Sequence, residues 1–183
     1  MSMLRRLSIP RSAWSSHPHW PTQTLLLGSH DSFRQISRQL ITQTAADDHV
    51  DWVALVYPQW IWGMRRHEAY EEHKLYPYLT RRWGIDFDHA RQGHQQLHEA
   101  DDAVRRALEQ WNRDGHRSAL LAALQEHDRV LDEHLEHEET RVIPALLELT
   151  PQQFEDYRSR SLPELMRQLD EAEGPPERLP GSA

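Results

Sequence analysis

The sequence contains no cysteine among its 183 residues. This absence excludes disulfides, cysteine nucleophiles, thiolate zinc sites and iron–sulfur clusters held by cysteine. Glycine is also scarce, with 7 copies, and apolar residues recur at helical rather than alternating intervals, which argues against an all-β fold. No apolar run approaches the length of a membrane span, and residues 1–20 lack the apolar core of a secretion signal. We therefore expect a soluble cytoplasmic protein with no membrane partner.

Basic residues form no continuous stripe, and the formal net charge is -8, so nucleic acid is not an expected partner. The hydrophobic share of 38% and the 7 tryptophans suffice for the core of a single domain. Histidine is the residue type in excess, with 13 copies. Because imidazole is the commonest metal ligand in proteins, the positions of these histidines decide what the sequence predicts.

Four long segments carry apolar residues at the spacing of one helix face, which predicts an all-α fold. They are expected over about residues 22–44, 48–82, 86–112 and 118–149, with short connections between them. Long helices with short connections predict an up-down-up-down four-helix bundle over residues 22–149. Pro58, inside the second segment, is expected to kink that helix or to mark its start.

The two ends of the chain are expected to lie outside the bundle. Residues 1–21 contain three prolines and are predicted to form an irregular arm, whose Trp14 and Trp20 pack on the domain. Thr150 followed by Pro151 is typical of a helix start, so residues 150–170 are predicted to form a short C-terminal helical extension. Residues 171–183, rich in proline, glycine and glutamate, are predicted to be a disordered tail.

One pattern occurs twice: HEAYEEHKLYP at residues 67–77 and HLEHEETRVIP at residues 134–144. In each stretch a histidine and a glutamate are four residues apart, which places them one turn apart on the same helix face. Two histidines repeat this spacing in the intervening segment, and another lies on the apolar face of the first. Together these candidate ligands are His30, His67, Glu71, His94, His98, His134 and Glu138.

The candidate ligands interrupt helix faces that are otherwise apolar. Burying an unpaired polar group costs on the order of 2–7 kcal/mol, and more for a charge, so the set predicts a compensating cation. Nitrogen-rich ligation favours iron, zinc, copper or nickel over magnesium or calcium. Seven side chains exceed the needs of one tetrahedral zinc and fit two ions with space for a bridging oxygen and a small ligand. No Glu-x-x-His and no His-Glu-x-x-His occurs, which argues against ferritin-like and zincin sites.

Other polar residues on the same segments receive more ordinary interpretations. Glu136 and Glu139 are expected to be surface charges, and Asp101 a partner of a metal ligand or a solvent-facing residue. His127 is interpreted as a core residue in preference to a partner of a metal ligand or a residue at the entrance to the site. If only one of the two third-segment histidines binds, one metal has an open position. The remaining helical histidines are expected at the surface: His73, His89, His116 and His137.

The order of these motifs resembles the hemerythrin-like family, the HHE cation-binding domain, over roughly residues 22–149. Members carry a histidine on the first helix, H-x3-E on the second, H-x3-H on the third, and a histidine followed by a carboxylate on the fourth. The resemblance implies a four-helix bundle with a non-haem di-iron centre. Glu71 and Glu138 would bridge two oxo- or hydroxo-bridged irons and the five histidines would cap them, with zinc or manganese as less favoured ions. The spacing of His134 and Glu138 is that of the HHE branch, which argues against simple oxygen transport.

Three functions remain open from the sequence. The first is a non-enzymatic protein that binds or senses oxygen, nitric oxide, iron or redox state, with a small diatomic ligand and with output through a protein partner or a homo-oligomer. No acid, base or nucleophile outside the metal ligands can be singled out as catalytic. The second is a di-iron enzyme acting on oxygen or peroxide. The third is a helical interaction module whose site binds zinc or nothing.

Overall fold

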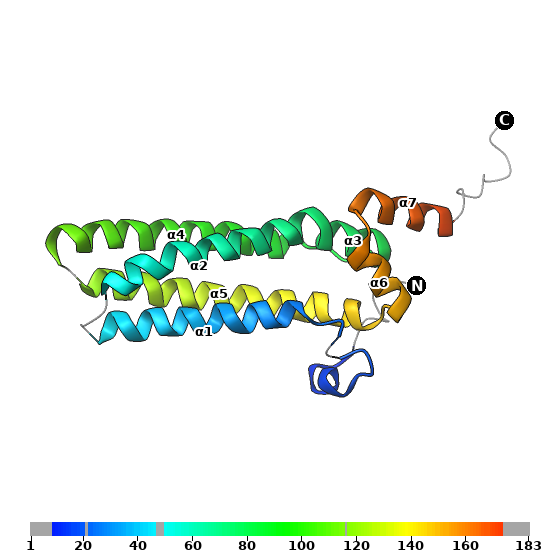
Figure 1. Ribbon diagram of the computed structural model, residues 1–183, viewed down its shortest axis with the longest axis horizontal. Coiled ribbons are helices and arrows are strands. Elements are labelled where there is room, and N and C mark those ends of the chain that lie inside the picture. The colour runs from blue at the N-terminus through cyan, green and yellow to red at the C-terminus, as the bar shows by residue number, and fades with distance from the viewer. Residues whose placement is uncertain (1–8, 21, 47–49, 116, 174–183) are drawn as a thin grey trace.

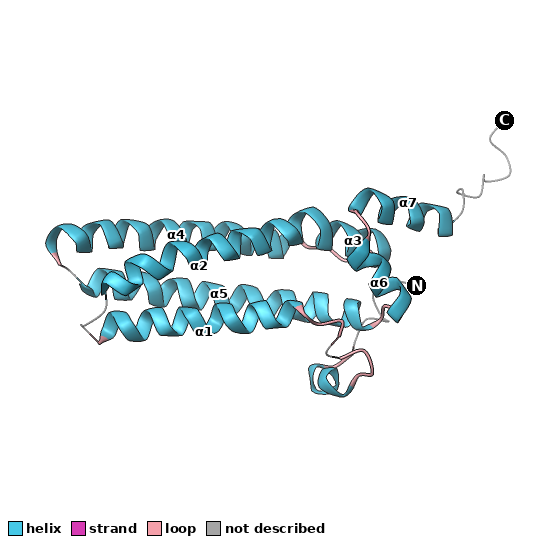
Figure 2. Cartoon of the chain, in the orientation of Figure 1, coloured by secondary structure: helices cyan, strands magenta, loops and turns pink. Residues whose placement is uncertain are grey.

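The computed structural model describes residues 9–20, 22–46, 50–115 and 117–173, and within these ranges the chain is helical and contains no strand. Four long helices lie side by side along the longest axis of the molecule (Figures 1 and 2). They are α1 (Leu26–Ala45), α2 (Val50–Tyr70), α4 (Asp88–Asp114) and α5 (Arg117–Leu147). The all-α prediction is therefore confirmed. Among the described helices, none is both long enough and apolar enough to cross a bilayer.

The second predicted helix continues through three elements. After α2 come a π-helical turn, η3 (Glu71–Leu75), and α3 (Tyr76–Trp83), which ends at Gly84 with φ of +67°. Pro58 lies inside α2 and does not mark its start. The helical hydrogen bonding widens at η3, where the N–H of Tyr76 donates to the carbonyl oxygen of Glu71, five residues back. Such widened turns are often found at functional sites.

Two apolar clusters form most of the core, one toward each end of the long helices. The first contains Tyr57, Leu97 and Leu131, and the second contains Leu75 and Val142. On the same helices, five of the candidate ligands occupy positions between the members of these two clusters: His30, His67, Glu71, His94 and Glu138. The fold therefore places the polar residues in a layer across the middle of the bundle, with apolar packing on both sides.

The N-terminal arm contains a 3-10 helix, η2 (Arg11–Ser16), and packs against the C-terminal half of α5. Trp14 is buried against Ile143 and Leu147, and Trp20 packs on the same cluster, so the expected contact of both tryptophans with the domain is confirmed. Residues 1–8 and Pro21 of the predicted arm lie outside the described ranges.

The C-terminal extension forms two helices, α6 (Pro151–Ser159) and α7 (Leu162–Glu173). Thr150 caps α6 as the sequence predicts, because its hydroxyl accepts from the N–H of Gln153 at 3.3 Å. The predicted disorder of residues 171–183 is wrong for the first three residues, which belong to α7, where helical hydrogen bonding continues past the predicted limit. Residues 174–183 lie outside the described ranges.

Candidate metal centre

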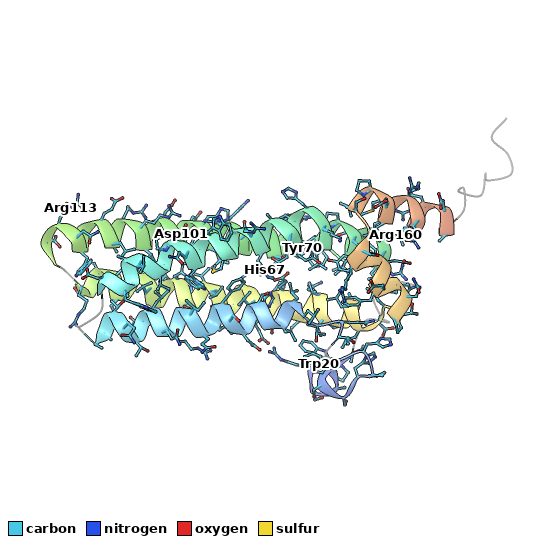
Figure 3. All side chains as sticks on the ribbon, in the orientation of Figure 1. Trp20, His67, Tyr70, Asp101, Arg113 and Arg160 are labelled. Carbon is cyan, nitrogen blue, oxygen red and sulfur yellow. The ribbon has the colours of Figure 1, made fainter. Side chains whose placement is uncertain are left out.

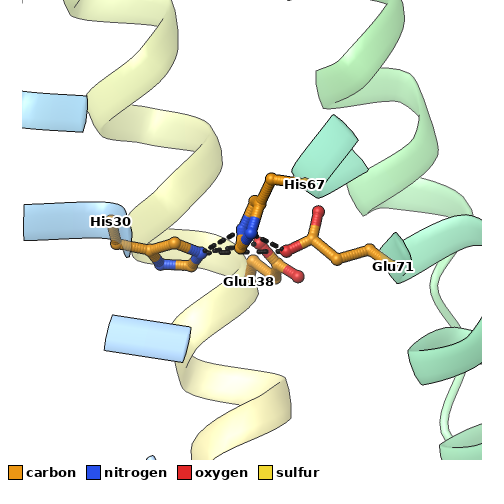
Figure 4. Close-up of side chains that lie close together, drawn as sticks. All are labelled: His30, His67, Glu71 and Glu138. Carbon is orange, nitrogen blue, oxygen red and sulfur yellow. Dashed lines mark hydrogen bonds and ion pairs between the residues drawn. The ribbon is translucent and has the colours of Figure 1, made fainter. Parts of the chain in front are cut away.

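The first group of candidate ligands draws on α1, α2, η3 and α5 and contains His30, His67, Glu71 and Glu138 (Figure 4). The Nε2 atoms of His30 and His67 are 3.0 Å apart. Glu71 Oε1 lies 2.6 Å from Nε2 of His67, and Glu138 Oε2 lies 3.5 Å from Nε2 of His30. Two nitrogens and two oxygens from different helices thus converge on one point, as ligands of a single cation do.

The second group consists of Glu71, His94 and His134. Glu71 Oε2 lies 3.3 Å from His94 Nε2, and the two imidazole rings are 4.6 Å apart between centroids. Glu138 Oε2 lies 3.8 Å from His134 Nε2, so this oxygen is near one histidine of each group. Glu71 presents one carboxylate oxygen to each group. The two groups are therefore neighbours joined by carboxylates.

Several of these atoms are buried without a hydrogen-bond partner. Both oxygens of Glu71, Oε2 of Glu138 and Nε2 of His94 are in this position. The cost of an unsatisfied buried group is about 1–3 kcal/mol, and more for a charge. Since imidazole nitrogen and carboxylate oxygen are the ligands that iron and zinc accept, the donor set fits one or two such cations.

The two buried carboxyl groups have opposite protonation tendencies. Burial and the nearby charge of Glu71 raise the pKa of Glu138 well above its usual range. Burial also opposes ionisation of Glu71, but His30, His67 and His94 outweigh it and hold the pKa of Glu71 well below its usual range. The ligand oxygens of Glu71 and Glu138 lie within 4.8 Å of each other. Ionisation of both carboxyl groups at this separation requires positive charge between them, which bound cations would supply.

A second carboxylate orients one histidine in each group. Glu139 accepts from Nδ1 of His30 at 3.1 Å, and Glu72 accepts from Nδ1 of His94 at 2.9 Å. Since a carboxylate accepts, Nδ1 carries the proton and Nε2 keeps a lone pair toward the site. The two sequence repeats therefore share a further role: the glutamate after each joining glutamate fixes a histidine of another helix.

The interpretation of Glu139 as a surface charge is wrong, because only 2% of its surface is exposed. Besides His30, Glu139 accepts from Nη1 of Arg34 at 2.7 Å and from Nη2 of Arg11 at 3.3 Å. The reason is that α1 and the N-terminal arm cover this position of α5, since His30 and Arg34 of α1 and Arg11 of η2 all contact Glu139.

Glu136 is exposed, as expected, and pairs with Arg11. Tyr76 is buried and donates its hydroxyl to Oε1 of Glu138 at 2.9 Å. That hydrogen bond satisfies the oxygen of Glu138 that faces away from the histidines.

His98 lies outside both groups. Its Nε2 is 2.6 Å from Oε1 of Glu68, and 45% of its side chain is exposed. The structure thus brings together six of the seven predicted ligands and places His98 at the edge of the bundle.

Asp101 is neither a partner of a metal ligand nor solvent-facing. It is buried, accepts from the Tyr57 hydroxyl at 2.8 Å and pairs with Arg65 and Arg105. Its place on the apolar seam of the third segment was the available signal for burial, but that place gives no indication of these partners.

The remaining histidines mostly follow the sequence interpretation. His127 is buried in the core, and His73 and His89 are exposed. His137 is half-buried and stacks on His89 with 3.8 Å between ring centroids, because α4 and α5 bring the two rings together. His116 lies outside the described residues.

A pocket adjoins the second group, with a cavity volume of about 20 Å³, which leaves room for the smallest molecules only. Glu71, His94 and His134 line one part of it, and most of the remaining wall is apolar, with Phe33 and Met64 among its members. Charged residues line the pocket as well, including Arg65, whose side chain is one-third exposed. A small molecule in this pocket would contact the second group directly. Figure 3 labels His67 and Asp101, two lining residues at different levels of the bundle.

The absence of a side chain at Gly93 leaves room for the imidazole of His134. A Cβ atom at position 93 would lie 2.3 Å from Nδ1 of His134, which no relaxed contact allows. We expect Gly93→Ala to displace the imidazole and to lower the amount of metal bound per chain, as measured by elemental analysis. Gly63→Ala is the matched control, because nothing lies within 4 Å of its added Cβ. In a helix that change is expected to stabilise by roughly 0.5–1 kcal/mol. Equal metal content in both variants would contradict this role of Gly93.

A protein-family model, described as the hemerythrin HHE cation binding domain, matches residues 22–146. The matched range contains every residue of the two groups. The chain has no significant match among curated proteins or among solved structures.

Proposed function

Because the chain belongs to the hemerythrin HHE cation-binding family, we propose that it holds two iron ions between its long helices. In this proposal His30 and His67 bind one ion, His94 and His134 bind the other, and Glu71 and Glu138 join the two. The up-down-up-down order of the four long helices is part of the proposal. His98 is left out of the ligand set because its ring is engaged by Glu68.

The observation that carries the proposal is the position of Glu71. Its side chain is 1% exposed, neither oxygen has a hydrogen-bond partner, and each oxygen faces the histidines of a different group. A buried carboxylate arranged this way is suited to two cations at once. A single cation would leave one of its oxygens uncompensated.

Bound iron would supply reversible binding of a small diatomic molecule, oxygen or nitric oxide, or a change of redox state. The chain contributes the pocket, which touches the second group through Glu71, His94 and His134 and is otherwise largely apolar. Glu72 and Glu139 hold His94 and His30 in fixed orientations, so the ligand atoms need no rearrangement. We therefore propose a binding or sensing protein whose output passes through its helical surface to a protein partner or to a second copy.

The test is elemental analysis of protein purified without added metal, with an absorption spectrum before and after azide. Two irons per chain and a visible band that changes with azide would support the proposal. Zinc at one ion per chain would contradict it and favour the interaction module.

An enzyme acting on oxygen or peroxide is the second candidate. The observation that favours it is the pocket itself, because it gives small molecules direct access to the second group. Peroxide turnover by the metal-loaded chain, absent in His67→Ala, would establish this function in place of simple binding.

A further inference from the structure

The pocket beside the metal centre has a second polar end at His127 of α5, and Trp60 of α2 packs against this histidine. His127 lines the pocket with 1% of its surface exposed, and neither Nδ1 nor Nε2 has a hydrogen-bond partner. Trp60 is also buried, its Nε1 has no partner, and its ring lies 5.2 Å from the imidazole of His127. Three polar atoms on two neighbouring rings are thus buried without a partner, which is unfavourable for folding.

These atoms do not belong to the metal centre. His127 precedes His134 by seven residues, which is two helical turns, or about 10 Å along α5. Leu131, which lies between the two histidines in α5, also lines the pocket. A molecule that satisfies His127 therefore occupies a different part of the pocket from one that contacts His94 and His134.

The charged neighbours of His127 are already engaged with one another. Asp101 accepts from the Tyr57 hydroxyl at 2.8 Å and pairs with Arg65 at 3.2 Å and Arg105 at 3.1 Å. This closed network balances the carboxylate and leaves His127 without a share in it. The partner that His127 requires is consequently not supplied by these side chains.

The chemistry of the missing partner follows from the protonation of the ring. Burial lowers the pKa of His127 to about 4, so the imidazole is neutral near pH 7. A neutral imidazole offers one N–H donor and one acceptor nitrogen, and the indole of Trp60 adds a second donor. The complement is a molecule with oxygen lone pairs and an O–H. The apolar wall on both sides disfavours a charged occupant.

We propose that the Trp60–His127 end of the pocket is a binding site for a small uncharged hydroxylic molecule, with hydrogen peroxide as its probe. This site uses no metal ligand and goes beyond the proposed function. Because His127 and the second group line the same pocket, a molecule bound at His127 would lie about two helical turns from the second metal group.

The test is a titration of the full-length chain with hydrogen peroxide after chelation, so that no bound metal can consume the probe. The readouts are the indole N–H signal of Trp60 and the ring ¹⁵N signals of His127 in NMR spectra. Met64 lines the pocket and is oxidisable, so the titration uses a Met64→Leu background. Assignment comes from Trp60→Phe, which preserves an aromatic ring at this position.

We expect both signals to shift and to saturate in the millimolar range, while the exposed Trp62 indole stays unchanged. In His127→Leu the apparent affinity reported by Trp60 is expected to fall at least 10-fold, with the fold checked by its melting temperature. No saturable shift, or a linear shift shared by Trp62, would overturn the proposal and leave water as the occupant. Metal content is measured separately, so failure here does not bear on the di-iron proposal.

Discussion

Replacing Glu71 with glutamine is expected to remove both metal ions of the proposed centre from the chain. Glutamine keeps the shape of the side chain, but it lacks the negative charge and the second equivalent oxygen that the two groups share. Loss of an outer hydrogen-bonding partner of a metal ligand typically costs ~10–100-fold in affinity, and a shared ligand should cost more for each ion. Elemental analysis of the purified variant is expected to fall from two ions per chain toward zero.

Glu99→Gln is the control for that measurement, because Glu99 is exposed on α4 and belongs to neither group. The substitution removes one carboxylate and changes the charge by the same amount as Glu71→Gln. The variant protein is expected to retain both ions. A Glu71→Gln protein that keeps two ions would show that the carboxylate does not join them. Loss of only one ion would assign Glu71 to a single group.

Chelation is expected to lower the melting temperature of the wild-type chain by roughly 10 °C or more. An ion present at 1,000 times its Kd stabilises the folded state by about 4 kcal/mol. For a chain of this size each kcal/mol corresponds to roughly 2–4 °C. The metal-free layer also leaves buried carboxylate and imidazole atoms unsatisfied in the middle of the bundle.

The same chelation applied to Glu71→Gln supplies the comparison, since a variant without bound ions has nothing to lose. The melting temperature of this variant is expected to change by no more than about 2 °C on chelation. The variant thus controls for effects of the chelator that do not depend on bound metal. An unchanged wild-type melting temperature would contradict a stabilising metal centre and would favour the interaction module.

The repeated pattern in the second and fourth segments predicted most of the candidate site. A histidine and a glutamate four residues apart must share a helix face, and an apolar face must turn inward, so His67, Glu71, His134 and Glu138 could be placed from spacing alone. His30 and His94 followed from the same argument because each lies on an apolar face of its own segment.

His98 shows what spacing cannot predict. It shares the i, i+4 relation with His94, yet it lies at the edge of α4, where Glu68 of α2 reaches it. Which residue of a neighbouring helix competes for a ring depends on the rotation of both helices, and a single sequence does not contain that information. The π-helical turn η3 is similar, because no residue type in Glu71–Leu75 marks it in advance.

Glu139 contacts both α1 and the N-terminal arm, at residues more than a hundred positions before it in the sequence. It accepts from His30 and also pairs with Arg11 of the N-terminal arm. Thermodynamic reciprocity then applies: if docking of the arm tightens cation binding by some factor, cation binding tightens docking by that same factor. With such coupling, a ligand or partner that displaced the arm from α5 would lower the affinity of the His30 group for its cation. Cation binding at the proposed centre would then respond to events at the protein surface.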